Sequence, residues 1–145
     1  MILIADTSGL IAALNPAEDM HAAAREVLKR ETAVVSPLVL PEFDHLMGQR
    51  IGFDASTTAV KFVLDQFSAG RHRLASITVD DLLRAHEVRM KYADLCLDIA
   101  DTVGVVLADR YKTDRVFTLD QRDFRAIKPL TSGFDAFKIL PYDEV

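Results

Sequence analysis

Residues 1–14, MILIADTSGLIAAL, decide how the rest of the chain is interpreted. The first five residues form a short apolar run with β-forming side chains, which predicts a buried strand at the start of the chain. Asp6, Thr7 and Ser8 then supply side-chain oxygens that can cap a helix beginning near Ser8. A strand that leads directly into a helix is typical of a parallel α/β sheet. In such sheets the carboxyl ends of the strands line the ligand-binding crevice, and Asp6 lies at that position.

The remainder of the chain continues this alternation of strands and helices. Further strands are predicted at residues 33–36, 73–78 and 116–119, and a plausible fifth strand lies at a sheet edge at 136–141. Helices are predicted from residue 8, at 19–30, from 37 to the region of Gly48 and Gly52, and at 54–68, 78–91 and 101–111. This order predicts a three-layer α/β/α fold with a central parallel sheet of four to five strands. The length of 145 residues fits one domain, 1–145.

Composition narrows the class of protein. The longest apolar runs are shorter than the ~20 residues of a membrane span, and the start of the chain lacks a signal peptide, so we expect a cytoplasmic protein without a membrane segment. The single Cys96 excludes an internal disulfide and a cysteine-based metal site. Any metal must therefore rest mainly on oxygen ligands, which suit Mg²⁺ or Mn²⁺. The net charge of -5 argues against a broad nucleic-acid-coating surface but not against RNA as a substrate.

Four carboxylates lie at the edges of apolar segments: Asp6, Glu42, Asp101 and Asp120. Asp6 and Asp120 directly follow predicted strands, whereas Glu42 and Asp101 lie in, or at the start of, predicted helices. Folding can therefore bring all four together. A cluster of this kind repels itself unless a cation neutralises it, so the pattern favours a metal site.

Each of these acids also has a purely structural explanation. Asp6 and Asp101 can be helix N-caps, a role that stabilises a helix by ~1 kcal/mol. Glu42 alone is more typical of a solvated helix position, and Asp120 alone of a turn after a strand. The site hypothesis rests on the four residues as a set.

The residues around the four acids resemble the PIN-domain family, and more narrowly the VapC-type ribonuclease toxins of bacterial toxin–antitoxin pairs. The resemblance covers nearly the whole chain in the expected order. It is carried by four motifs: DTSGLIAAL at 6–14, SPLVLPEF at 36–43, YADLCLDIADT at 92–102 and FTLDQRDF at 117–124.

The resemblance implies a Mg²⁺- or Mn²⁺-dependent endoribonuclease that cleaves RNA, such as tRNA or rRNA loops, by metal-activated water. It also implies a homodimer and a small VapB-like antitoxin that blocks the site. Asp6, Glu42, Asp101 and Asp120 match the acidic quartet of the family. We expect Asp6 and Asp101 to be the firmest metal ligands, with Glu42 and Asp120 completing the coordination and orienting the attacking water.

Asp98 is an alternative to Asp101 for the third position of the acidic quartet. The family pattern places this third acid before a small residue at a helix start, which selects Asp101, followed by Thr102, over Asp98. Asp98 is then a charged surface residue or an additional ligand through water. Asp123, three residues after Asp120, is assigned a capping or loop role with ligation as the alternative.

Other polar residues near these motifs have supporting roles. Thr7 or Ser8 is a candidate donor that holds a ligand oxygen in place. Arg122 and Arg125 either hold RNA phosphate near Asp120 or form a solvated basic segment.

Two alternatives to a toxin stay open from the sequence. One is a metal-dependent nuclease of RNA processing or repair, or a related phosphatase. The other is a catalytically inactive module that binds RNA or protein. The presence of all four acids argues against the inactive module.

Overall fold

A computed structural model of the chain describes residues 1–143. Within this range the strands form one five-stranded sheet of order β3-β2-β1-β4-β5, and every neighbouring pair is parallel. The predicted parallel sheet and its position in an α/β/α fold are confirmed. The strands are β1 (Ile2–Ala5), β2 (Thr32–Val35), β3 (Arg73–Leu74), β4 (Arg115–Phe117) and β5 (Lys138–Leu140).

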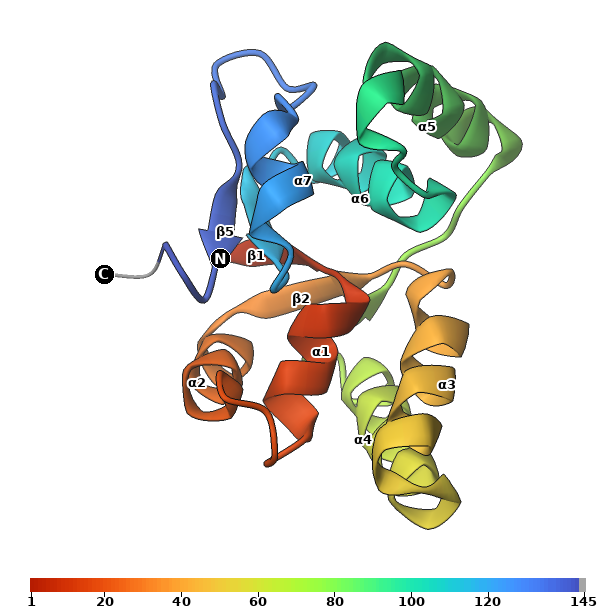
Figure 1. Cartoon of the computed structure of the whole chain (residues 1–145), viewed down its shortest axis with the longest axis vertical. Helices are drawn as coiled ribbons and strands as arrows, with labels where there is room; N and C mark the ends of the chain where they lie inside the picture. Colours follow the sequence, from red (N-terminus) through yellow and green to blue (C-terminus); the bar gives the residue numbers. More distant parts are fainter. Residues whose placement is uncertain (144–145) are drawn as a thin grey trace.

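Helices connect the strands and cover both faces of the sheet (Figure 1). A 3₁₀ turn at Ala93–Leu95 precedes the helix that begins at Ile99. The α-helices are α1 (Thr7–Leu14), α2 (His21–Arg30), α3 (Val39–Ile51), α4 (Phe53–Ser68), α5 (Val79–Lys91), α6 (Ile99–Arg110) and α7 (Gln121–Ala126).

Two apolar cores separate the three layers. Alternate residues of a strand point to opposite faces, so Leu3 and Ala5 of β1 pack with α1 to α4, whereas Ile4 packs with α5 to α7. Figure 1 shows the same division, with α1 to α4 on one side of the sheet and α5 to α7 on the other. Within residues 1–143, no helix combines the length and apolar character needed to cross a membrane.

The structure differs from several of the predicted boundaries and contains one helix that was not predicted. The third strand is limited to Arg73–Leu74 rather than 73–78, because only Ala75 adds one further backbone hydrogen bond, to Val35 O, beyond it. Helix α6 begins at Ile99 and not at Asp101. The short helix α7 was not predicted. The fifth strand does lie at a sheet edge, as expected.

Gly9 lets α1 approach the sheet very closely. A Cβ atom at this position would lie 2.3 Å from the carbonyl oxygen of Phe117 in β4. The same carbonyl accepts a 2.9 Å hydrogen bond from the backbone N–H of Asp6. The first turn of α1 is therefore fixed against the end of β4. Asp120, the other predicted acid at a strand end, follows β4.

Candidate active site

The four predicted acids lie on segments that meet at the carboxyl edge of the sheet. Asp6 lies between β1 and α1, and Asp120 follows β4, the neighbour of β1 in the sheet. Glu42 is in the first turn of α3, which follows β2, and Asp101 is in the first turn of α6. The topology thus places the four segments at the switch between the central strands, where ligands bind in this class of fold.

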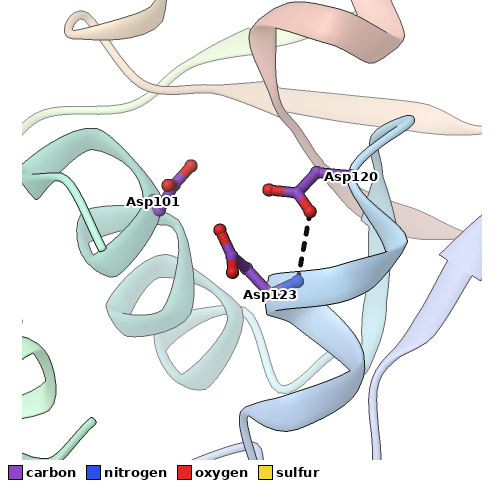
Figure 2. Close-up of side chains that lie close together, drawn as sticks. All are labelled: Asp101, Asp120 and Asp123. Carbon is purple, nitrogen blue, oxygen red and sulfur yellow. Dashed lines mark hydrogen bonds between the residues drawn. The ribbon is translucent and has the colours of Figure 1, made fainter. Parts of the chain in front are cut away.

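Three half-buried carboxylates form a tight group at this edge. Asp101, Asp120 and Asp123 each offer an oxygen, and these oxygens lie within 4.8 Å of one another. Figure 2 shows Asp101 reaching from α6 toward α7, with Asp120 and Asp123 opposite it. The group contains two of the four predicted acids and adds Asp123, for which a capping or loop role was preferred.

Helix α7 explains why Asp123 joins the group. Asp120 is the N-cap of this helix, and its Oδ1 accepts a 3.1 Å hydrogen bond from the backbone N–H of Asp123. The Asp123 side chain in the first turn then faces Asp101 across the gap between the two helices (Figure 2). The turn-former explanation of Asp120 is therefore incomplete, because the residue caps a helix and also belongs to the acidic group.

Asp6 lies beside this group and is held by a network of hydroxyl groups. Thr118 Oγ1 donates a 2.8 Å hydrogen bond to Asp6 Oδ2 and accepts a 3.0 Å bond from the backbone N–H of Asp120. Because the one proton of Thr118 goes to Asp6, the Ser8 hydroxyl is the donor in its 3.1 Å bond to Thr118 Oγ1. The Ser8 oxygen in turn accepts from the backbone N–H of Leu119, at 2.9 Å.

This network changes two sequence-based assignments. Ser8 supports a candidate ligand, as suggested, but acts through Thr118, which had no assigned role although it is part of the FTLD motif. Asp6 occupies the N-cap position of α1, yet its side chain makes no capping hydrogen bond. Capping alone therefore does not explain Asp6.

The choice between Asp98 and Asp101 is clarified by the start of α6. Asp98 is exposed and is the N-cap, and its Oδ1 accepts a 2.8 Å hydrogen bond from the backbone N–H of Asp101. Capping therefore belongs to Asp98, and the proposed capping role of Asp101 is wrong. This leaves the Asp101 carboxylate to face Asp120, and Asp101 also lines a small cavity that it shares with Asp6.

The electrostatic environment of these acids disfavours negative charge. Burial, followed by the charges of Asp6, Asp98 and Asp120, raises the pKa of Asp101 to about 8. Burial is also the main cause that raises the pKa of Asp6, although the hydrogen bond from Thr118 opposes the shift. Carboxylates held together under such conditions gain most from a bound cation.

Glu42 is the least closely held of the predicted acids. It is exposed on α3, and its charge is near enough to contribute to the raised pKa of Asp6. Within the described residues it is not part of the tight group of carboxylates. Its role in a metal site stays a prediction.

The two candidate phosphate-binding arginines differ in their contacts. Arg125 is paired with Asp143 through hydrogen bonds of 2.7 and 3.2 Å, and it also contacts Gln121. Arg122 has an 82% exposed side chain, and its Nε lies 4.0 Å from Asp123 Oδ1. Arg122 is therefore the arginine that lies beside the acidic group and faces solvent.

Comparison with known proteins gives consistent matches. Residues 3–129 match the family profile described as PIN domain. The chain is 38% identical to Ribonuclease VapC26 of Mycobacterium tuberculosis over 141 residues, which cover 96% of this chain and all of that protein.

Solved structures with lower identity share the fold. The toxin VapC20 of M. tuberculosis, described as cleaving the sarcin–ricin loop, has a TM-score of 0.75 and 20% identity, and the match covers 92% of this chain and 96% of that one. VapBC2 from Rickettsia felis, bound to a DNA fragment from its promoter, has a TM-score of 0.64 and 19% identity, with 90% and 96% covered.

Proposed function

The chain belongs to the PIN-domain family, and on this basis we propose that it is a VapC-type endoribonuclease, the toxin of a toxin–antitoxin pair. The full-length similarity to Ribonuclease VapC26 supports the ribonuclease activity. The single observation that carries the proposal is the group of carboxylates at the carboxyl edge of the sheet.

The donor set at this edge fits a hard divalent cation. Asp101, Asp120 and Asp123 offer only oxygen ligands within a space of one coordination sphere, and Asp6 lies next to them. Burial, followed by the charges of Asp6, Asp98 and Asp120, raises the pKa of Asp101, so its carboxylate would gain from a bound cation. We therefore propose Mg²⁺ or Mn²⁺ as the cofactor.

The residues of the chain divide the work in the proposed reaction. Asp101, Asp120 and Asp6 would hold the cation, and Asp123 would complete its coordination or support the other ligands. A divalent cation at this place would lower the pKa of water and offset the charge that develops on the leaving oxygen of a phosphodiester. Thr118 fixes the orientation of Asp6. Glu42, at the exposed border of the site, is proposed to orient the attacking water.

The proposed substrate is an exposed loop of a structured cellular RNA. Single-stranded loops allow bases to be splayed out and the backbone to enter a narrow acidic site. The exposed Arg122 is the proposed phosphate contact beside the site, because Arg125 is already paired with Asp143.

A small antitoxin is the proposed protein partner. Support comes from the similarity to VapC proteins, one of which was solved as the VapBC2 assembly. We propose that the antitoxin blocks the acidic edge and that a reading frame for it adjoins that of this chain. A homodimer stays a prediction.

We expect the purified chain to cut structured RNA at defined loop positions when Mg²⁺ or Mn²⁺ is present. EDTA should abolish the cuts, and excess Mg²⁺ should restore them, because the carboxylates need the cation. Sequencing of the new RNA ends measures both the activity and its position. Cleavage that persists in EDTA would contradict the metal-dependent mechanism.

A further inference from the structure

A second feature lies at the opposite edge of the sheet from the acids. A cavity of about 620 Å³ opens where β2 begins, at Thr32, and where the chain enters β3, at 70–72. Helices α2 and α4 form its sides, both in the layer that Figure 1 shows below the sheet. Its size falls within the ~300–1,000 Å³ that is usual for small-ligand sites.

Four cationic side chains line this cavity, although the whole chain carries a net charge of -5. Arg25, Lys29 and Arg30 come from α2, and Arg71 comes from the segment before β3. This concentration of positive charge in an acidic protein favours an anionic ligand.

The acid in the wall of the cavity does not cancel this charge. Glu31 is buried and bound to the buried guanidinium of Arg115 from β4. Burial alone would raise the pKa of Glu31, but the hydrogen bonds from the N-terminal ammonium and from Arg115 hold it below its usual value. The negative charge of Glu31 is therefore matched by Arg115 and the N-terminal ammonium. Lys29 is paired with Glu26 on the same helix, at 3.5 Å, so the charge available to a ligand comes mainly from arginines.

Arg25 and Arg71 are available to a ligand. Within residues 1–143 neither side chain makes a hydrogen bond or an ion pair with another residue. An anion can thus bind both guanidinium groups without breaking an existing contact. Guanidinium groups bind phosphate through paired hydrogen bonds, so phosphate is the anion that fits best.

The other wall of the cavity is suited to a planar group. Phe62 of α4 lines it and is 44% exposed, and Leu28 and Leu14 add apolar surface. Gln66, one turn after Phe62, can donate and accept hydrogen bonds. An aromatic ring beside an amide is a typical arrangement for stacking and reading a nucleobase.

We propose that this cavity binds a nucleoside monophosphate unit, with its phosphate on Arg25 and Arg71 and its base against Phe62. The unit can be a free nucleotide or one nucleotide of an RNA strand, since both present the same phosphate and base. The site is separate from the acidic edge and does not depend on the proposed catalytic activity.

Calorimetric titration of the full chain in EDTA tests this proposal without RNA hydrolysis. The probes are AMP, adenosine, inorganic phosphate and a short single-stranded oligoribonucleotide. AMP that binds saturably and more tightly than adenosine or phosphate supports a free nucleotide. Binding of the oligoribonucleotide alone supports an RNA strand. Absence of saturable binding by both AMP and the oligoribonucleotide would overturn the proposal, as would phosphate binding as tightly as AMP.

Matched variants locate the binding. Arg25→Gln with Arg71→Gln should weaken it at least about tenfold, because both phosphate contacts are lost. Lys61→Gln with Lys112→Gln removes the same charge from exposed positions outside the cavity and should leave the binding affinity unchanged.

Phe62→Ala should weaken binding of AMP but not of phosphate. Equal losses in the two charge variants would show non-specific attraction and contradict the site, provided that circular dichroism shows both to be folded.

Discussion

At the scale of single residues, the carboxyl group of Asp101 is held under conditions that oppose its ionisation. Its neighbours Asp6, Asp98 and Asp120 are all acidic, and burial adds to their effect. A protein keeps such an arrangement only at a cost in stability when the cation is absent. The same arrangement would favour binding of the proposed cation.

Asp101→Asn should therefore stabilise the metal-free protein at neutral and alkaline pH. The folded-state pKa of about 8 exceeds the unfolded value of 3.8, so the wild type binds more protons when folded and loses stability as the pH rises from about 4 to 8. The variant lacks this loss. We expect its advantage to grow from pH 5 to pH 8 and to reach on the order of 2 kcal/mol.

Urea unfolding in EDTA at several pH values measures this difference. Asp19→Asn, a change of the same type at an exposed turn, should follow the wild type at every pH. An advantage of Asp101→Asn that stays constant with pH would show that ionisation of Asp101 is not its source.

Thr118 is the residue whose role the sequence did not reveal. Its hydroxyl orients Asp6 and accepts the N–H of Asp120, so it joins two of the proposed ligands. Thr118→Val keeps the shape but removes these bonds. We expect kcat for RNA cleavage, and the affinity for Mn²⁺, to fall about 10–100-fold, as is usual for residues that orient metal ligands.

Thr113→Val is the matched control for this change. Thr113 is also buried, and its hydroxyl donates a 2.7 Å hydrogen bond to Ile2 O at the other end of the sheet. Thr113→Val should lose about as much stability as Thr118→Val but keep its RNA-cleavage activity at temperatures well below its unfolding. Equal losses of activity in the two variants would assign a merely structural role to Thr118.

At the scale of elements, the contact of α1 with β4 decides where Asp6 lies. Gly9 permits this contact because any larger residue would meet the backbone of Phe117. Asp6 and Ser8 lie at the start of α1, and Thr118, which bonds to both, directly follows β4. The packing of one helix on one strand therefore sets the geometry of the site.

Gly9→Ala should destabilise the protein by about 1–3 kcal/mol and reduce RNA cleavage, because the added methyl group forces α1 away from β4. Gly48→Ala is the control. Its Cβ would lie 3.9 Å from Ser56 Oγ, so the change should be neutral or stabilising, as in an ordinary helix interior. Thermal unfolding and the cleavage rate check both variants. A stable, active Gly9→Ala would contradict the close contact.

Boundaries of elements were harder to predict than their order. The alternation of strands and helices was visible in the apolar pattern, and the predicted start of a helix at residue 78 agrees with the capping box that Thr78 and Asp81 form at α5. Helix α7 has only six residues, and a single one of them, Phe124, is buried, so it carries no helical repeat that the sequence could show. Because α7 was missed, Asp123 was not placed opposite Asp101.

At the scale of the whole molecule, two edges of one sheet carry opposite charge. The acids gather at the carboxyl ends of β1 and β4, whereas the cationic cavity lies where β2 and β3 begin. The net charge of -5 hides this division, and composition alone could not reveal the cavity. Its residues come from α2, α4 and the approach to β3, segments that only folding brings together.

The site itself was predictable as a set but not in its geometry. The four motifs indicated the family and selected Asp6, Glu42, Asp101 and Asp120. Side-chain positions then required the structure, which shows that the exposed Asp98 caps α6 and that Asp101 belongs to the acidic group. The roles of all these acids in catalysis stay predictions.

The most direct test of the central claim is the rate of Mg²⁺-dependent RNA cleavage by the variant with both Asp6→Asn and Asp101→Asn. Amides keep the shape of the side chains but remove the charges that would hold the cation, while the hydroxyl network around Thr118 can persist. We predict a folded protein with no cleavage above background and no saturable Mn²⁺ binding, beside a fully active Asp19→Asn control. Cleavage by the double variant at the wild-type rate would contradict the account.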